Sequence, residues 1–260
     1  MEFLEIKQGL SPLILCFPHT GPYIPDAIND TLNEQGREKA DTDWHLHALY
    51  DGLAPEATSI RTCIHRYVID CNRDPQGKSL YPGQNTTDLV PLTDFDGLPL
   101  HKQVPTPSQI NARLRDFHRP YHTAIETQIE RVKAAHGFAI VYDCHSIRSN
   151  IPFLFEGTLP HFNIGTNEGK TCAPSIEKAV YTLCEKAQDY SVVLNGRFKG
   201  GWTTRHYGLP DINVHAVQME IAQRSYMIET TPWTYETNKA QSLRSHLKEI
   251  LDELTNWNPQ

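Results

Sequence analysis

The sequence predicts a single α/β domain over residues 1–260, with a mixed, mostly parallel sheet and helices on both faces. Short apolar runs of strand length alternate along the chain with segments whose apolar residues recur at helical spacing. This alternation is typical of a sheet covered by helices on both sides. No internal repeat, low-complexity tract or linker divides the 260 residues, a length that one large α/β domain accommodates.

Apolar runs bounded by turn residues predict the strands. The run that begins at Phe138 has four apolar residues followed by Tyr142 and Asp143, which suits a strand buried on both faces. The predicted strands cover 12–17, 59–65, 66–70, 138–143, 191–194 and 214–221. The turn-rich segment 75–107 is predicted to form a long loop that covers the site.

Apolar residues three or four positions apart predict the helices. These helices begin at Thr42, Ser108 and Pro174 and cover 238–256. Pro120 is expected to interrupt the second helix, because proline removes a backbone donor and clashes with the preceding turn. A new or kinked helix then ends at Gly137.

Bulk properties exclude several classes of protein. A formal charge of -7 and a pI of about 6.0 give no electrostatic support for a nucleic-acid partner. No apolar run approaches the roughly 20 residues that span a bilayer. The N-terminus carries acids where a signal peptide carries positive charge, so we expect a cytoplasmic protein. The six cysteines form no CxxC pair and are expected to be reduced and buried. The oligomeric state is left open.

Polar side chains follow four of the strand-like runs and point to a metal site. They are His19, Asn72 with Arg73, His145 and Glu220. Strands that run in the same direction gather such groups at one edge of a sheet. Two neutral imidazoles and a carboxylate are a common catalytic zinc set. We take Asp43 as the third ligand, because it begins a helix just beyond the His19 loop, with Asp41 and His45 as rivals.

The remaining candidates suggest acid–base chemistry and anion binding. Glu220 lies in an apolar run, where a carboxylate is rare unless it is functional or paired, for example with Arg224. A general base for a metal-activated water is the functional interpretation. Arg73 offers a planar fork for a carboxylate, with Asn72 as an amide donor beside it. Arg66 suits either an oxyanion donor or a surface cation.

The Gly-rich segment 196–208 contributes further cations. Lys199, Arg205 and His206 are candidates for binding anionic substrate groups, or are ordinary loop charges.

Six segments of the chain resemble motifs of the N-formylglutamate amidohydrolase family. They are PHTG (18–21), TDWH (42–45), RYVIDCNRD (66–74), DCHS (143–146), NGRFKGGWTTRHYG (195–208) and VQMEIAQRSYM (217–227). The likeness spans roughly residues 10–230. It implies a phosphorylase/hydrolase-like fold shared with zinc carboxypeptidases and aspartoacylases. It also implies hydrolysis of a small N-formyl amino acid, N-formyl-L-glutamate, to formate and L-glutamate, a late step of histidine degradation.

The resemblance also implies a role for each candidate. One zinc ion, or another divalent metal, would be held by His19 and His145. The other implied roles are substrate-carboxylate binding by Asn72 and Arg73, carbonyl polarisation by Arg66 and a general base at Glu220. Carboxypeptidases carry a glutamate three residues after the first histidine, where this chain has Pro22, so the third ligand stays open between Asp43, Asp41 and others. The alternatives are another zinc amidohydrolase of the same fold, such as an aspartoacylase-like deacylase or a carboxypeptidase, and a metal-free dicarboxylate-binding protein.

Overall fold

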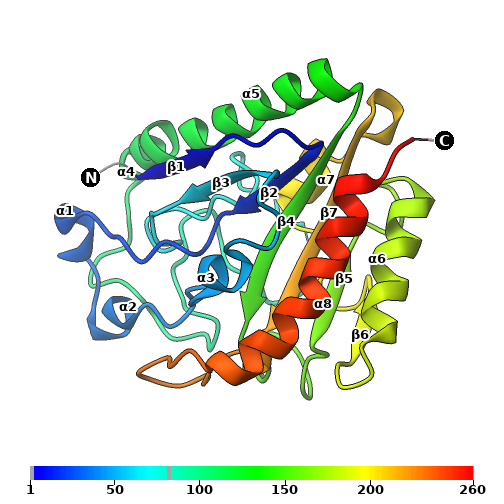
Figure 1. Ribbon diagram of the computed structural model, residues 1–260. Coiled ribbons are helices and arrows are strands. Elements are labelled where there is room, and N and C mark those ends of the chain that lie inside the picture. The colour runs from blue at the N-terminus through cyan, green and yellow to red at the C-terminus, as the bar shows by residue number, and fades with distance from the viewer. Residues whose placement is uncertain (1–2, 81–82, 260) are drawn as a thin grey trace.

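Seven strands form one mixed sheet at the centre of the folded protein. A computed structural model describes residues 3–80 and 83–259 (Figure 1). The strand order is β1-β3-β2-β4-β7-β5-β6. The strands are β1 Leu4–Lys7, β2 Leu13–Phe17, β3 Thr58–Thr62, β4 Ala139–Ile147, β5 Phe162–Gly165, β6 Val192–Leu194 and β7 Val214–Ala222. Strands β3, β2, β4 and β7 are mutually parallel, whereas β1 and β5 pair antiparallel to their neighbours β3 and β7. The predicted fold class is confirmed.

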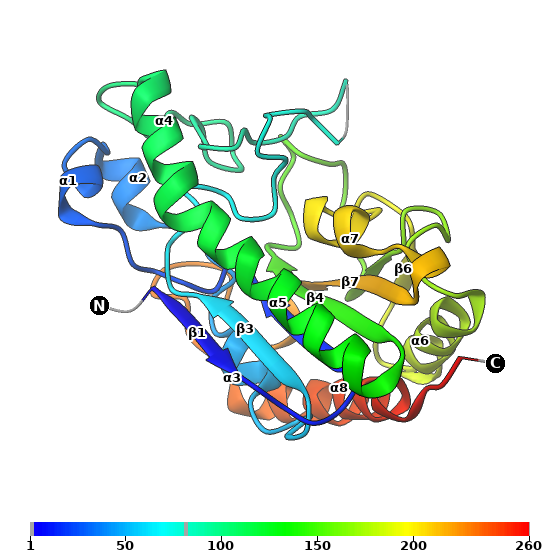
Figure 2. The same cartoon turned by 90° about the horizontal axis from the view of Figure 1, so that it is seen from above.

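Helices cover both faces of the sheet, and the side chains of the central strands alternate between them. Leu13 and Tyr142 pack with α3 Leu46–Tyr50, α6 Pro174–Lys186 and α8 Thr237–Asn256. Ile14 and Val141 pack on the other face against α5 Arg119–His136. Figure 2 shows α4 Pro107–Arg113 and α7 Trp202–Tyr207 on the same side as α5. The central strands are therefore buried on both faces, as their continuous apolar runs predict.

The shorter helices lie in the connections. They are α1 Asp26–Asn29, α2 Glu34–Glu38, the π-helical turn Leu114–His118 and the 3-10 turns Pro210–Ile212 and Gln223–Ser225. Over the described residues, no helix is both long enough and apolar enough to cross a membrane. All six cysteines are free thiols, and all but the half-buried Cys63 are buried.

Three local predictions were wrong. Residues 66–70 form turns rather than a strand, because their backbone wraps around the site instead of joining the sheet. The helix expected from Thr42 begins only at Leu46, after His45 adopts a left-handed conformation with φ of 59°. The helix expected from Ser108 is capped instead by Thr106, whose hydroxyl accepts from the backbone N–H of Gln109 in a capping box.

Pro120 does not interrupt the helix that contains it. The chain passes from α4 through the π-helical turn into α5, and the backbone N–H of Arg119 donates to Leu114 O, five residues earlier. This wider turn accommodates the proline ring at the start of α5, where its missing N–H is tolerated. Gly137 ends α5 with φ of 80°, as predicted. Strands β1 and β5 and helix α7 were not predicted.

The segment between β3 and α4 is a long loop, as the sequence predicts. Its described residues contain only isolated bridges, such as Thr93 to Pro99. The loop is attached to the body of the protein by the buried carboxylate of Asp41, which accepts from Phe95 N at 2.9 Å. Phe95 in turn packs on Arg66, whose guanidinium carbon is 4.9 Å from the ring centroid. The loop therefore forms one wall of the site.

Candidate functional site

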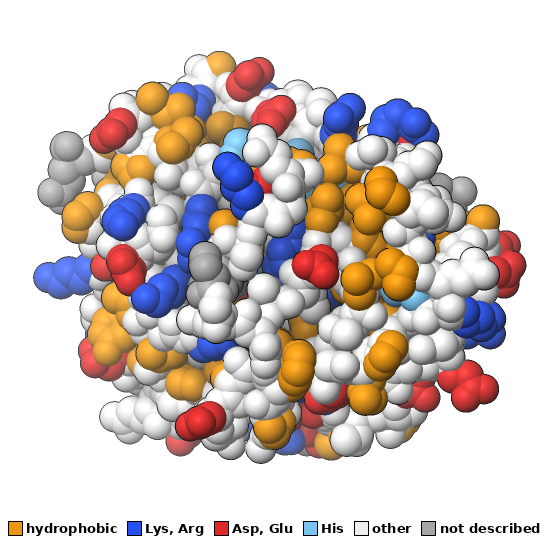
Figure 3. All heavy atoms as spheres, turned by 180° about the vertical axis from the view of Figure 1, so that it is seen from behind, with side chains coloured by type: hydrophobic (Ala, Val, Ile, Leu, Met, Phe, Trp, Pro, Cys, Tyr) orange, Lys and Arg blue, Asp and Glu red, His pale blue; other side chains and the backbone are white. Residues whose placement is uncertain are grey.

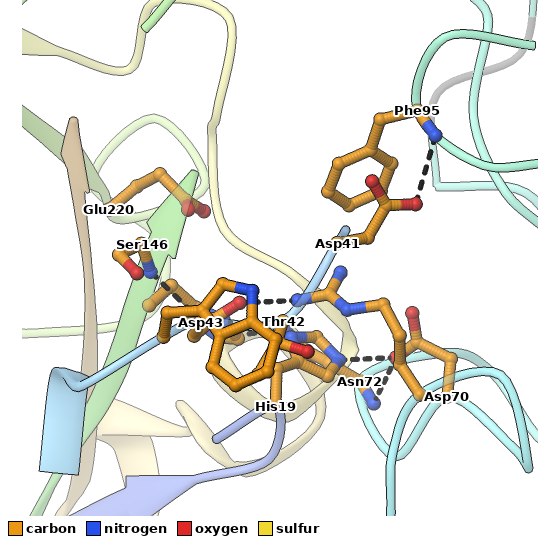
Figure 4. Close-up of polar contacts among 12 residues, drawn as sticks. His19, Asp41, Thr42, Asp43, Asp70, Asn72, Phe95, Ser146 and Glu220 are labelled. Carbon is orange, nitrogen blue, oxygen red and sulfur yellow. Dashed lines mark hydrogen bonds and ion pairs between the residues drawn. The ribbon is translucent and has the colours of Figure 1, made fainter. Parts of the chain in front are cut away.

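Three potential metal ligands converge beside the carboxyl ends of β2 and β4. His19 lies two residues after β2, and His145 lies near the end of β4. Asp43 belongs to the turn before α3 and is attached to both strands, since its N–H donates to His19 O at 3.1 Å and its Oδ2 accepts from Ser146 N at 3.0 Å. The ligand atoms of the three residues lie within 4.8 Å of one another, and all three residues are buried. Figure 4 shows His19 and Asp43 side by side.

The two rival ligands lie elsewhere. Asp41 points toward the covering loop, where it accepts from Phe95 N (Figure 4). His45 donates through Nε2 to Trp233 O at 2.6 Å and stands at the start of α3. The structure thus brings Asp43, rather than Asp41 or His45, to the two imidazoles.

Hydrogen bonds to carboxylates orient both imidazoles. His19 Nε2 lies 2.6 Å from Asp70 Oδ1, and His145 Nε2 lies 3.1 Å from Asp143 Oδ1. The Nδ1 atoms of the two rings then face each other at 3.2 Å, on the side of Asp43. A proton on one Nδ1 joins the two rings in a hydrogen bond. When each ring instead carries its only proton on Nε2, both Nδ1 atoms present lone pairs to the same space, where a cation can bind them. Two nitrogens and one carboxylate are also a donor set that Zn²⁺ prefers, so these residues fit a divalent metal.

The charges of the three ligands respond to burial and to their neighbours. Burial lowers the pKa of His19 to about 4, and the nearby Arg66 cation acts in the same direction. Burial also opposes protonation of His145, but the carboxylates of Asp143 and Asp43 outweigh it and raise its pKa. Burial disfavours the charged form of Asp43, yet Arg66, whose Nη2 is 2.5 Å from Asp43 Oδ1, and the imidazoles keep its pKa low. Asp43 is therefore ionised and can act as a carboxylate ligand.

Asn72 belongs to the network around His145. Its Nδ2 lies 2.9 Å from His145 Nε2 and 3.5 Å from Asp143 Oδ2, and its Oδ1 accepts from Thr203 N at 2.8 Å. Since Nδ2 and a protonated Nε2 are both donors, both bond to the Asp143 carboxylate when His145 presents Nδ1 as a ligand. Thr204 Oγ1 donates to the same carboxylate at 3.1 Å. The first turn of α7 is thereby connected to His145.

Glu220 stands beside His145 in the sheet. The two residues are paired in the register of β4 and β7, and Glu220 lines the same pocket with only 7% of its surface exposed. Gln218 Nε2 donates to Glu220 Oε2 at 3.1 Å and so fixes the carboxyl group. Burial raises the pKa of Glu220 to about 7, with Asp43 acting in the same direction and His145 in the opposite one. A carboxyl group with this pKa exchanges protons near neutral pH.

A pocket of about 580 Å³, measured with its open mouth, connects these groups to solvent. The described residues that line it are His19, Arg66, Asn72, Arg73, Asn85, Thr86, Thr87, Phe95, His145, Ser146, Ile147, Leu154, Arg197, Phe198, Gly201, Gln218 and Glu220. On the face seen in Figure 3, Lys and Arg side chains gather near the middle, beside an area of hydrophobic side chains. An acidic protein thus carries a locally basic surface.

The pocket includes some of the predicted substrate-binding residues. Arg73 lines it and donates from Nε to Thr87 O at 2.9 Å. Lys199 and Arg205 are not among the described lining residues. Lys199 forms an exposed ion pair with Glu168 at 2.7 Å, and Arg205 Nε donates to Gly200 O at 2.8 Å.

Sequence reasoning missed Asp70 and Gln218, and it covered Arg197 only within the range 197–206, which was expected to supply a second cation for the substrate. Asp70 directly precedes the Cys71-Asn72-Arg73 segment, and Gln218 precedes Glu220 by two residues, so both face the same side as a predicted site residue. This spacing could have predicted that both residues belong to the site. Arg197 shares one flexible segment with Lys199 and Arg205, and only the folded loop distinguishes them.

Comparisons with known proteins agree with the fold and with the family resemblance seen in the sequence. The sequence model of the N-formylglutamate amidohydrolase family matches residues 11–227. The chain is 43% identical to the N-formylglutamate deformylase of Pseudomonas aeruginosa over 260 residues, which is 98% of this chain and 97% of that protein. It is also 43% identical over 259 residues to the deformylase of Pseudomonas putida, with the same two coverages.

Solved structures show a similar fold. The crystal structure of N-formylglutamate amidohydrolase from Ralstonia eutropha JMP134 has a TM-score of 0.81 at 23% identity, covering 97% of this chain and 96% of that one. A gene product of Agrobacterium tumefaciens has a TM-score of 0.76 at 18% identity, covering 97% and 94%.

Proposed function

Because the chain belongs to the N-formylglutamate amidohydrolase family, we propose that it hydrolyses N-formyl-L-glutamate to formate and L-glutamate. The observation that carries this proposal is the convergence of His19, Asp43 and His145, with His19, His145 and Glu220 lining a pocket that Arg73 also lines. The 43% identity to two deformylases supports the same reaction. In this proposal residues 1–260 act as one catalytic domain, and the reaction is a late step of histidine degradation.

One divalent metal ion, Zn²⁺ in the first instance, would be held by His19 Nδ1, Asp43 and His145 Nδ1. When bound at such a site, zinc polarises a carbonyl group and lowers the pKa of water toward neutrality. Asp70 and Asp143 orient the two imidazoles by accepting from their Nε2 atoms. The ligand set and its supporting carboxylates are buried, which keeps their geometry fixed.

Glu220 moves the proton in this proposal. Its raised pKa suits a base that accepts a proton from the attacking water and then donates it to the leaving amine. The bond from Gln218 Nε2 to Glu220 Oε2 holds the carboxyl group at the pocket wall through both steps.

Arg66 stabilises the negative charge that develops on the formyl oxygen. Its Nη2 donates to Asp43, and Phe95 covers its guanidinium plane. Arg66 Nε is buried and has no hydrogen-bond partner within the described part of the chain. A buried donor without a partner is unfavourable unless a ligand atom reaches it, which fits an oxyanion donor.

Two carboxylates on N-formylglutamate require cationic anchors. Arg73 would bind the α-carboxylate, because it follows Asn72, which contacts His145. Asn72 adds an amide to the pocket wall, although its Nδ2 also contacts His145 and Asp143 and its Oδ1 accepts from Thr203 N. Lys199 and Arg205 stay predicted binders of the second carboxylate until they are tested.

Amine release from N-formyl-L-glutamate, N-acetyl-L-aspartate and a short peptide, with formate also measured for the first substrate, tests the assignment. We expect N-formyl-L-glutamate to have the highest kcat/KM. A higher kcat/KM for N-acetyl-L-aspartate or for the peptide would instead identify a deacylase or a carboxypeptidase. Tight glutamate binding without hydrolysis of any of the three would indicate a binding protein.

A further inference from the structure

Two kinds of groups line the pocket. His19, His145 and Glu220 line the part where the reaction is proposed to occur, here called the reactive end. The arginines Arg73 and Arg197 line the same pocket but belong to segments outside the central strands. One bound molecule can therefore meet both reactive groups and cations.

Arg73 belongs to the reactive end. Its Nη1 lies 3.7 Å from Oδ2 of Asp70, the residue that holds His19. Its Nε and Nη2 donate to the backbone oxygen and the hydroxyl of Thr87, both at 2.9 Å. These contacts fix Arg73 close to the metal ligands, so the carboxylate nearest the reacting carbon is the one it reaches.

Arg197 is held by different parts of the chain. It lies three residues after β6, and its Nε donates to Leu154 O at 3.1 Å while its Nη2 donates to Asn85 O at 2.9 Å. Its guanidinium carbon is 5.4 Å from the centroid of the Phe198 ring. Two backbone carbonyls from separate loops therefore orient the guanidinium before any ligand binds, which reduces the entropy lost on binding.

Apolar side chains lie in the wall with Arg197. Ile147, Leu154 and Phe198 all line the pocket. The side chain of glutamate places two methylene groups between the α-carbon and the second carboxylate. Methylene groups suit this apolar wall, and a carboxylate beyond them is stable in a partly enclosed pocket only when it is paired with a cation.

From this geometry we propose that Arg197 binds the side-chain carboxylate of the substrate and makes the protein selective for N-formyl amino acids with an acidic side chain. The proposal rests on the proposed deformylase function and adds a specificity-determining residue to it. Arg197 differs from Lys199, two residues later, which pairs with Glu168 at the surface.

The test compares N-formyl-L-glutamate with N-formyl-L-glutamine, which has nearly the same shape but an uncharged side chain. The variants are Arg197→Met, Arg197→Lys and the control Lys248→Met, at an exposed lysine of α8 that pairs with Asp252. We expect Arg197→Met to lower kcat/KM for the glutamate substrate about 10- to 100-fold, chiefly through KM, because a charge-assisted hydrogen bond is lost. The same variant is expected to change kcat/KM for the glutamine substrate by less than about threefold.

The control and the conservative variant show whether the effect is specific to Arg197 and to its charge. Lys248→Met is expected to keep the wild-type preference between the two substrates. Arg197→Lys is expected to keep part of it, since it retains the positive charge. If Arg197→Met does not fold, as judged by circular dichroism, the Arg197→Lys and Lys248→Met proteins still compare the pocket cation with a distant one. An unchanged preference in every folded Arg197 variant overturns the role of Arg197 alone. A wild-type protein that releases formate from neither substrate overturns the proposed function as well.

Discussion

Replacing Asp70 with Asn is expected to weaken metal binding without unfolding the protein. Asp70 is fully buried, and its Oδ1 lies 2.6 Å from His19 Nε2 and accepts from Asn72 N at 2.8 Å. Asn keeps the size and an acceptor oxygen, so the substitution removes mainly the negative charge. His19 then loses the carboxylate that makes its Nδ1 a stronger donor to a metal.

The size of the effect follows from this contact. A hydrogen bond to a charged partner contributes about 1.5–3 kcal/mol, and about 1.4 kcal/mol corresponds to a tenfold change in Kd. Loss of the charge is therefore expected to raise the Kd for Zn²⁺ roughly 10- to 100-fold, which agrees with the usual effect of removing such a supporting carboxylate.

The assay is competition for Zn²⁺ with a chromophoric chelator at a fixed pH. Asp211→Asn, at an exposed aspartate of the Pro210–Ile212 turn, serves as the matched control and is expected to leave the Kd unchanged. Urea denaturation of the metal-free proteins checks that the variants are folded. A Kd for Asp70→Asn within twofold of wild type would refute the idea that Asp70 supports the metal site through His19.

The remaining predictions concern Glu220 as the general base, the pH at which it titrates, and the packing of Gly201 in the pocket wall. Glu220→Gln is expected to lower kcat about 10²- to 10⁴-fold with bound zinc unchanged, and near-full formate release from the zinc-loaded variant would remove Glu220 as the base. Because burial raises the pKa of Glu220 to about 7 and the base acts when deprotonated, kcat/KM should rise between pH 6 and 8, and a rate independent of pH across that interval would contradict this. Gly201→Ala places a Cβ 2.2 Å from Asn72 Nδ2, so the free energy of unfolding in urea should fall by about 1–3 kcal/mol, and the rate of formate release should fall with it. An unchanged urea midpoint and an unchanged rate would show that the structure accommodates the extra methyl group.

The central strands and the two histidines were predictable because their signals are local. Strands β2 and β4 are buried on both faces, so each begins in the sequence as a continuous apolar run that leads to a polar residue. Strand β7 is equally buried but carries His215, Gln218 and Glu220 among its apolar residues. Parallel pairing of β2 with β4 then brings His19 and His145 to the same edge of the sheet. Asp43 was a choice among three neighbours, and only its folded contacts with His19 O and Ser146 N show how it reaches the imidazoles.

The features that were missed depend on contacts distant in sequence. Residues 66–70 resemble a strand in composition, yet Asp70 is held by His19, which lies 51 positions earlier, and the segment turns around the site. Arg197 and Lys199 are equivalent cations in the sequence, and bonds to Leu154 and Asn85 place only the first of them in the pocket wall. No local pattern encodes such pairings, because each depends on where two loops meet after folding.

Titration of the metal-free protein with Zn²⁺, followed by the rate of formate release from N-formyl-L-glutamate, tests the central proposal most directly. We expect little or no formate release before zinc is added. The rate should then rise linearly with added zinc and reach a plateau at one zinc ion per chain, because His19, Asp43 and His145 form one site. Full formate release from the metal-free protein, or no release after one zinc ion has bound, would contradict it.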